Sequence, residues 1–576
     1  MMSYKDIYEN WLNYKRLNAE AKRELESVKD NAEEIEYRFG AELEFGTAGM
    51  RGIIGYGTNM MNVYTVRRAT QGLAEFIKTL GADAMKRGVA ISFDTRLKSD
   101  EFARAAAEVL AANKICSHLY SQPHPVPMLS FAVRELNAVA GIMVTASHNP
   151  KQYNGYKVYG ADGAQMSPED TAVVVKFISE ITDYLGVPSP TVEEVKEYIT
   201  VIPEKSKIDK KYYKALTKLT LSKKAVKKCG KDLKLVYTPV HGSGYIPVTT
   251  ILKKIGINAT VVQEQTTRDT DFSTVEVPNP EFKETLSMGI KLAQKIGATV
   301  VFGTDPDSDR LGVAVKNKEG EFEALSGNQV GILLLDYILT RLKEENALPE
   351  NAAVVKSFVT TGMAKAICQK FGVTLFEVPV GFKFIGEKIK LWEKDRSYSY
   401  VFGFEESCGY LRGTHARDKD AVVASMLTAE MVCYYTSKGT TVFDRLQEIY
   451  DTYGYVLDCN ISIPFKGLNA MKDMNAVVDS LKAKPATKFD IYNVTAVRDY
   501  SKNLKTDIAT GATEEIGSPL TNCVYYELEN GSFICVRPSG TEPKLKIYFS
   551  VKAHNKQDAE AALEKMQAAV KKIIKA

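Results

Sequence analysis

The fold of this chain is decided by the stretch VAGIMVTASHNP, residues 139–150. Its first six residues, 139–144, are apolar and predict a short buried strand, and the Asn-Pro pair at 149–150 predicts a turn. Ser147 therefore stands on a loop at the carboxyl end of a strand, where open α/β sheets bind their ligands. A serine beside a histidine in such a place is a candidate nucleophile, although residues 145–150 also fit a polar turn without chemistry.

Strands and helices alternate on both sides of this stretch. We expect helices at 66–80, 99–113 and 167–185, and strands at 89–93, 155–159, 233–237, 259–262, 299–302, 353–356 and 399–402. This alternation is typical of mainly parallel sheets covered by helices on both faces. Ser147, Asp305 and Glu405 each follow an apolar strand end, which favours three similar units that each present one loop.

The pattern changes beyond about residue 440. Strand-rich sequence is expected at 456–464, 523–528, 532–536 and 544–551, followed by a lysine-rich helix over 556–575. At the other end, residues 3–39 are charged and helix-favouring and predict one or two surface helices. We therefore predict an α/β fold of three related α/β domains with mixed sheets, plus a smaller C-terminal α+β domain, around a central cleft. The expected domains are I at 1–206, II at 207–325, III at 326–440 and IV at 441–576.

Composition excludes several classes of protein. The chain has 576 residues, with 45% hydrophobic and 25% charged residues, which is ordinary for a soluble globular protein. A net charge of +4 gives no reason to expect nucleic acid or a membrane as partner. Eight scattered cysteines without a C-x-x-C pair, no signal-peptide core and no membrane-length apolar run favour a reducing, cytoplasmic location.

A loop of alternating acids follows the strand expected at 299–302. Asp305, Asp307 and Asp309 stand at every second position, and Pro306 stiffens the loop. Unpaired carboxylates at this spacing would repel one another, so a divalent cation is their natural partner, with a solvated acidic turn as the alternative. An EF-hand is excluded, because the sixth position is Arg310 where that loop requires glycine. We favour Mg²⁺, since three carboxylates leave room for a phosphate oxygen.

Two further loops carry polar groups suited to a phosphorylated sugar. In the glycine-bounded turn 403–409, Glu405 and Ser407 could bind vicinal sugar hydroxyls, or could only cap the turn. In the loop 537–543, Arg537, two hydroxyl side chains and backbone N–H groups around a glycine form a potential anion nest, or a plain hairpin turn.

Two cationic segments accompany these loops. The segment 44–52 is glycine-rich and holds Arg51, which fits close backbone approach to an anion or a simple connector. The segment 415–420 adds cations, Lys419 among them, that could face a phosphate. A nucleophile, a metal loop, a sugar loop and a separate phosphate nest are together what phosphoryl transfer on a phosphosugar needs.

These loops resemble those of the α-D-phosphohexomutase superfamily, and the resemblance runs from Phe45 to about Phe549. The segments 44–52 and 537–548 are similar to the longer phosphoglucomutase/phosphopentomutase branch. The resemblance implies four domains and interconversion of glucose 1-phosphate and glucose 6-phosphate. It also implies one Mg²⁺ per chain and glucose 1,6-bisphosphate as activator and intermediate. The expected partner is a phosphosugar, and we expect a monomer or weak dimer.

The resemblance also implies a role for each loop residue. Ser147 carries the phosphoryl group, and Asp305, Asp307 and Asp309 hold Mg²⁺ together with the phosphoserine oxygen. Glu405 and Ser407 bind sugar hydroxyls. The residues implied at the reaction centre are Arg51, His148, Lys157, Arg310 and Lys419, with Arg310 also a substrate contact. Those implied at the distal phosphate are Arg537, Ser539, Gly540 and Thr541.

One departure from the superfamily pattern affects proton transfer. The shorter phosphomannomutase branch has Gly-His after the loop serine, whereas here Ser407 is followed by Cys408. A histidine base at that position is therefore in doubt, and Lys157 and Lys419 become the candidate proton carriers.

Several activities stay open at this point. The stretch 378–384 is similar to the phosphoglucomutase version of the specificity loop and favours glucose, with phosphomannomutase or phosphopentomutase activity as alternatives. A phosphatase with Asp305 or Asp307 as nucleophile would leave Ser147 without a role. A non-catalytic sugar-phosphate sensor on the same scaffold is a remote alternative.

Overall fold

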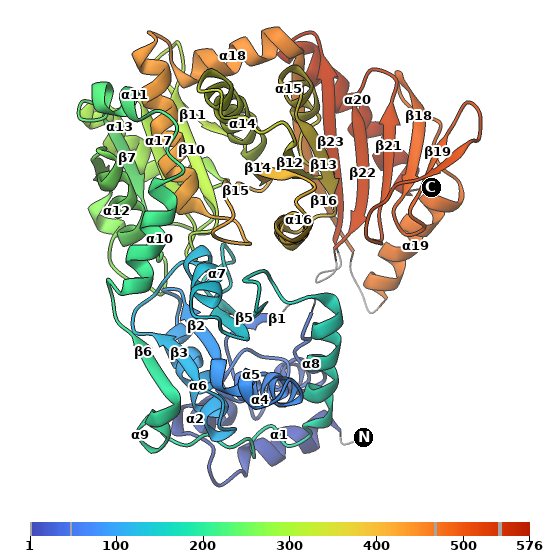
Figure 1. Cartoon of the computed structure of the whole chain (residues 1–576). Coiled ribbons are helices and arrows are strands. Elements are labelled where there is room, and N and C mark those ends of the chain that lie inside the picture. Colours follow the sequence, from blue (N-terminus) through green and yellow to red (C-terminus); the bar gives the residue numbers. More distant parts are fainter. Residues whose placement is uncertain (1–2, 47–48, 466–468, 540–543, 576) are drawn as a thin grey trace. The chain divides into compact units, whose positions relative to one another are not determined.

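The computed structural model describes residues 3–46, 49–465, 469–539 and 544–575 (Figure 1). The chain divides into two compact units. The first holds Met1–Ala324, Ile389–Leu391 and Gly409–Tyr434, and the second holds Leu325–Lys388, Trp392–Cys408 and Tyr435–Ala576. None of the eight cysteines, all of which lie within the described residues, forms a disulfide bond. Among the described helices, none combines the length and the apolar character that crossing a bilayer requires.

The chain begins with three short helices rather than the one or two predicted. They are α1 (Tyr4–Leu12), α2 (Ala19–Ser27) and α3 (Ala32–Phe39). A polar side chain precedes each helix, namely Ser3, Asn18 and Asn31, and accepts a backbone N–H of the first turn. Each such cap starts a new helix, which is why the segment breaks into three. Trp11 is buried, so the helices pack on the domain as well as facing solvent.

The first sheet has six strands in the order β1-β5-β4-β2-β3-β6. Their bounds are β1 Gly49–Ile53, β2 Val89–Phe93, β3 Ser117–Tyr120, β4 Ala140–Val144, β5 Tyr153–Gly160 and β6 Ile199–Ile202. Strands β2, β3, β4 and β6 run parallel, while β5 is antiparallel to both β4 and β1. The sheet is therefore mixed, as predicted, and its parallel strands end at one edge, where Ser147 follows β4.

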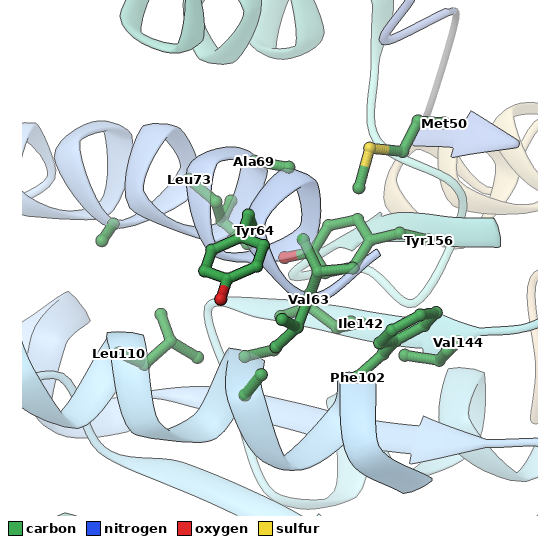
Figure 2. Close-up of a cluster of buried hydrophobic side chains, with 14 of the residues drawn as sticks. Met50, Val63, Tyr64, Ala69, Leu73, Phe102, Leu110, Ile142, Val144 and Tyr156 are labelled. Atoms are coloured by element: carbon green, nitrogen blue, oxygen red, sulfur yellow. The ribbon is translucent and has the colours of Figure 1, made fainter. Parts of the chain in front are cut away.

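Helices cover both faces of this sheet. They are α4 (Val63–Thr79), α5 (Ala82–Arg87), α6 (Ser99–Ala112), α7 (Val126–Glu135), α8 (Pro168–Glu180) and the short α9 (Val192–Val195). Figure 2 shows the core on one face, where Ile142 and Val144 of β4 meet Phe102 and Leu110 of α6. On the opposite face Met143 joins a separate cluster with α7. Because β4 is buried on both faces, its sequence is continuously apolar.

The second sheet carries the acidic loop. Its order is β11-β10-β9-β7-β8, with β7 parallel to β8 and β9, and β10 antiparallel to β9. The strands are β7 Leu235–Thr238, β8 Ala259–Val261, β9 Val300–Thr304, β10 Leu311–Lys316 and β11 Phe322–Leu325. The helices are α10 Lys207–Thr217, α11 Lys223–Cys229, α12 Tyr245–Ile255 and α13 Ser287–Ile296. Asp305 directly follows β9, so the acids stand at the carboxyl end of a parallel strand.

In the third α/β region, β12 (Ala352–Ser357) lies between β13 (Thr374–Val378) and β14 (Ser399–Glu405) and is parallel to both. The helices are α14 Gly327–Glu344, α15 Met363–Phe371 and α16 Phe382–Asp395. The chain continues through β15 (Gly409–Leu411), α17 (Ala421–Ser437) and α18 (Val442–Tyr453). Glu405 is the last residue of β14, again at a carboxyl end.

The C-terminal region is an antiparallel sheet with two helices, which agrees with the predicted α+β domain. The sheet order is β16-β23-β22-β21-β18-β19-β20, and β17 pairs with β18. The strands are β16 Tyr455–Pro464, β17 Lys488–Phe489, β18 Tyr492–Asp499, β19 Leu504–Asp507, β20 Thr513–Glu515, β21 Val524–Leu528, β22 Phe533–Pro538 and β23 Lys544–Ala553. The helices are α19 Ala470–Ala483 and α20 Lys556–Lys575.

Within the second unit, this sheet packs against the β12 region through aromatic and ionic contacts. Phe358 stacks on Tyr500, with ring centroids 4.3 Å apart. Beside this stack, Glu377 pairs with the buried Lys356 at 2.9 Å and with Arg498 of β18 at 3.0 Å. Burial alone would raise the pKa of Glu377, but the two cations outweigh it and lower that pKa to about 2.

The Glu377 ion pairs predict an acid-sensitive contribution to the stability of the second unit. The folded pKa lies below the unfolded value, so this contribution is complete above about pH 4.5 and is lost as the pH falls toward 2. We expect it to amount to about 2–3 kcal/mol at neutral pH. In urea unfolding, Glu377→Gln should therefore be less stable than wild type at pH 7, and the difference should shrink at pH 3. The exposed Glu387 provides a control, because Glu387→Gln should leave both midpoints unchanged.

Candidate active site

Ser147 sits in a tightly constrained loop. Its backbone is left-handed, with φ of 50°, and its N–H donates to Thr145 Oγ1 at 2.8 Å. The Ser147 hydroxyl donates to Asp305 Oδ2 at 2.8 Å and lies 3.2 Å from His148 Nδ1. The serine of the first domain and the first acid of the second domain are therefore in direct contact, and both are buried.

The three acids of the loop 305–309 converge. One carboxylate oxygen from each of Asp305, Asp307 and Asp309 lies within 4.8 Å of the others, and all three side chains are buried. Asp305 Oδ1 accepts the backbone N–H groups of Asp309 and Arg310, which shapes the loop. Asp307 Oδ1 and Asp309 Oδ1 accept no hydrogen bond from any described residue. Buried oxygens in this state are costly unless another group binds them.

Two lysines from distant segments face the acids. Lys157 Nζ lies 3.0 Å from Asp307 Oδ2. Lys419 Nζ lies 3.1 Å from both Asp309 Oδ2 and Asp418 Oδ1. The cluster thus combines carboxylates and ammonium groups from three separate stretches of the chain.

Burial and mutual repulsion shift the pKa values of the three aspartates. Burial, and then repulsion by Asp307 and Asp309, raise the pKa of Asp305 well above the usual range of a carboxyl group. Burial, and then repulsion by Asp307, likewise raise the pKa of Asp309. Burial would also raise the pKa of Asp307, but the Lys157 ammonium overrides it and holds this pKa below its ordinary value. When all three acids are ionised, their three negative charges face only the two ammonium groups of Lys157 and Lys419, so the charges of these five side chains do not balance.

This donor set fits a divalent cation. The ligands on offer are hard carboxylate oxygens, two of which have no hydrogen-bond partner among the described residues, and the Ser147 hydroxyl borders them. Mg²⁺ prefers such oxygen donors together with a phosphate oxygen.

The other residues of the first unit that were predicted at the reaction centre are His148, Arg51 and Arg310. Burial, and then the Arg310 and Arg51 cations, lower the pKa of His148 well below its ordinary value, which keeps the ring neutral. Arg51 donates to Asn149 Oδ1 at 2.8 Å, in the Ser147 loop. Arg310 pairs with Glu281 at 2.5 Å. Every predicted reaction-centre residue is thus found around Ser147 and the acids.

The predicted sugar and phosphate residues belong to the second unit. Glu405 is buried and accepts the Gly381 N–H at 3.0 Å, which joins the predicted sugar loop to the stretch 378–384. Arg537 is the last residue but one of β22 and hydrogen-bonds to Tyr548, and the Ser539 N–H donates to Lys544 O at 2.9 Å. Ser407 is partly buried in the turn after β14. Gly540 and Thr541 lie outside the described residues.

Sequence reasoning missed the groups that hold the lysines and the Ser147 loop. Asp418 contacts Lys419 and also accepts the Tyr159 hydroxyl at 2.9 Å. Arg96 is fully buried beneath the Ser147 loop and donates to its carbonyls. Only its position in the sequence could have pointed to Arg96, because it follows the strand 89–93 at the same sheet edge as Ser147.

The loop 239–244 contacts the backbone of the acidic loop 305–309, and the sequence analysis did not identify it. Ser243 donates through both its N–H and its hydroxyl to Pro306 O, at 2.8 and 2.9 Å. Gly244 is packed so closely that a Cβ would lie 2.5 Å from Ser308 Oγ. Val240 has φ of 47°, a rare conformation for a β-branched residue, and such backbone strain is concentrated near functional sites.

Comparison with known proteins gives matches along most of the chain. Four family models match, described as phosphoglucomutase/phosphomannomutase alpha/beta/alpha domains I, II and III and C-terminal domain. They match residues 42–185, 210–320, 326–453 and 494–573 respectively. A phosphoglucomutase of Staphylococcus aureus strain USA300 is 35% identical over 538 residues, which is 92% of this chain and 94% of that protein. Its counterpart in the bovine strain of the same species is 36% identical over 537 residues.

Solved structures share the fold. The putative phosphomannomutase of Thermus thermophilus has a TM-score of 0.67 at 24% identity, covering 92% of this chain and 99% of that one. The open form of parafusin, a Paramecium phosphoglucomutase, has a TM-score of 0.68 at 18% identity, covering 93% and 95%. Together with the four domain models and the relatives above 30% identity, this means that the chain belongs to the phosphoglucomutase/phosphomannomutase family and is a phosphotransferase of the mutase type.

Proposed function

We propose that this chain is a phosphoglucomutase that interconverts α-D-glucose 1-phosphate and glucose 6-phosphate through a phosphoserine at Ser147. The observation that carries the proposal is the 2.8 Å contact between the Ser147 hydroxyl and Asp305, inside a buried cluster of three carboxylates and two lysines. A serine that stores a phosphoryl group needs this surrounding, because charge must be neutralised where the group is transferred. The names of the Staphylococcus aureus relatives support glucose as the sugar.

The reaction is two transfers of the same kind. In the first, a substrate hydroxyl oxygen forms a bond to the phosphorus of phosphoserine 147, the bond from phosphorus to Ser147 Oγ breaks, and the product is glucose 1,6-bisphosphate. The hydroxyl proton leaves to a base, and Ser147 Oγ regains a proton. Lys157 and Lys419 are the candidate proton carriers, since both lie within 3.1 Å of the carboxylates around Ser147. In the second transfer the bisphosphate, turned around, returns its other phosphoryl group to Ser147.

The other loop residues have positioning roles in this proposal. Asp305, Asp307 and Asp309 would hold Mg²⁺ with the Ser147 oxygen, and the ion would supply positive charge to the transferring phosphoryl group. Arg51, His148 and Arg310 would surround that phosphoryl group. Contacts proposed for the rest of the substrate are Glu405 and Ser407 to sugar hydroxyls, and Arg537, Ser539, Gly540 and Thr541 to the distal phosphate.

A coupled assay tests the proposal. Glucose 1-phosphate, a trace of glucose 1,6-bisphosphate and Mg²⁺ are mixed with the protein, and glucose 6-phosphate formation is followed. We expect turnover that depends on the bisphosphate. Mannose 1-phosphate and ribose 1-phosphate are assayed in parallel. If either gives a higher kcat/KM than glucose 1-phosphate, that sugar phosphate is the preferred substrate and the assignment of glucose is wrong. An absence of turnover with all three sugars would favour a non-catalytic sugar-phosphate sensor.

A further inference from the structure

Arg96 is a buried cation that holds the backbone of the Ser147 loop. Its Nη2 donates to the carbonyl oxygen of Ser147 at 2.6 Å and also to that of Asn149. Its Nη1 donates to the carbonyl oxygens of Pro150 and Tyr153, at 3.0 and 3.1 Å. One planar guanidinium thus gathers four carbonyls from a single loop, and its side chain is fully buried.

Asp94 and Thr145 form a polar network that connects Arg96 to the Ser147 backbone. Arg96 Nε lies 3.4 Å from Asp94 Oδ2. Asp94 Oδ2 also accepts the Thr145 hydroxyl at 2.7 Å, and Thr145 Oγ1 in turn accepts the Ser147 N–H. Both the N–H and the C=O of Ser147 are therefore bound to one network. This explains how a non-glycine residue keeps φ of 50° there, a conformation that needs outside support.

The second domain closes the other side of this network. The Arg96 guanidinium lies over the ring of Phe272, with Cζ 5.2 Å from the ring centroid. Arg268 donates to the carbonyl oxygens of Thr95 and Arg96, at 3.0 and 2.9 Å, and to Asp100 at 2.8 Å. Phe272 and Arg268 belong to a segment of the chain to which no role in the proposed reaction has been assigned above.

We infer that Arg96 is a positioning residue: it sets the direction of Ser147 Oγ toward Asp305, and Arg268 and Phe272 of the second domain hold Arg96 in place. The inference rests on the proposed function for its catalytic consequence, but the geometry of the loop stands without it. Lysine cannot replace this arginine, because a single ammonium nitrogen has three donors and no fork to span four carbonyls.

The test compares Arg96→Lys with Arg68→Lys. Arg68 is a matched control, since it is also buried in the first domain, donates to a carbonyl (Ile181 O, 2.8 Å) and stacks on an aromatic ring (Tyr184, 4.1 Å). We expect Arg96→Lys to lower kcat about 10²-fold, the effect of displacing a reacting atom by about 1 Å, with little change in KM. Hydrogen–deuterium exchange of residues 145–153 should accelerate in Arg96→Lys and stay unchanged in Arg68→Lys. Arg68→Lys should keep kcat, whatever stability it loses.

A second variant covers the possibility that Arg96→Lys does not fold. Arg268 is partly exposed, so Arg268→Met should fold, while it removes the contacts to Thr95 and Arg96. It should lower kcat about 10-fold and accelerate exchange in residues 145–153. Unchanged exchange and unchanged kcat in a variant that folds, or in Arg268→Met alone if Arg96→Lys does not fold, would overturn the inference. If wild type turns over no phosphosugar, the proposed function fails, and the exchange experiment still decides whether Arg96 holds the loop.

Discussion

Ser147→Ala is expected to lose at least about 10⁴-fold in turnover, because it removes the atom proposed to carry the phosphoryl group. Wild-type protein incubated with glucose 1,6-bisphosphate should gain about 80 Da in intact mass, the mass of one phosphoryl group, and the variant should gain none. The Ser147 hydroxyl contacts His148 and Asp305 of the site itself, so its removal should preserve the fold. Intact-mass spectrometry and the coupled assay check both parts.

A buried serine of the same sheet provides the control. Ser92 lies in β2, and its hydroxyl donates to the His124 carbonyl at 3.0 Å rather than to a carboxylate. Ser92→Ala should cost about 1 kcal/mol of stability and leave both phosphorylation and turnover intact. Peptide mapping decides the alternative chemistry, because phosphate found on Asp305 or Asp307 would make the protein a phosphatase-like enzyme and contradict the assignment of Ser147.

Asp307→Asn is expected to lower turnover by about 10³-fold, since it removes a carboxylate from the proposed Mg²⁺ site. In metal-free buffer at neutral pH the variant should also have a lower melting temperature, because Lys157 holds the pKa of Asp307 below its ordinary value and the substitution leaves that ammonium without its carboxylate. Added Mg²⁺ should then raise the melting temperature of wild type much more than that of the variant. Thermal melts with and without Mg²⁺ measure both effects.

The exposed Asp232 of the same domain is a matched control. Asp232→Asn removes the same charge away from the cluster and should respond to Mg²⁺ as wild type does. Chelation gives an independent check: exhaustive EDTA treatment should abolish turnover and MgCl₂ should restore it. Full activity after EDTA would contradict a metal role for the three aspartates.

The strands that position the site could be predicted closely from the sequence. Those expected at 89–93, 139–144 and 299–302 correspond to β2, β4 and β9. Each is buried on both faces, so it appears as a continuous apolar run that polar residues interrupt sharply. The loops at their carboxyl ends could therefore be placed as well, and with them Ser147 and Asp305.

Two edge strands, β6 and β20, were not predicted. Strand β6 exposes Thr200 and Val201, and its sequence offers no continuous apolar run. Strand β20 is exposed along its whole length. A strand that buries only one face, or neither, lacks the apolar run on which the prediction depended.

The site was predicted as a set of loops, but not as a network. The aspartates and lysines could be named, because their types and spacing indicate a chemistry. The pairing of Lys157 with Asp307, and of Lys419 with Asp309, joins residues far apart in sequence. Arg96 is the strongest example, since a buried arginine bound to backbone carbonyls has no local pattern at all.

The return of the segment Gly409–Tyr434 to the first unit bears on how the protein is made. Domains generally fold as units while the ribosome is still extending the chain. Lys157 and Asp307 can therefore meet early, whereas Asp309 waits for its lysine until translation has passed Lys419. If translation stops before Lys419 has been added, the aspartates around Ser147 lack one of the two lysines that neutralise them. The acidic cluster therefore obtains both of its lysines only after synthesis has gone well into the second half of the chain.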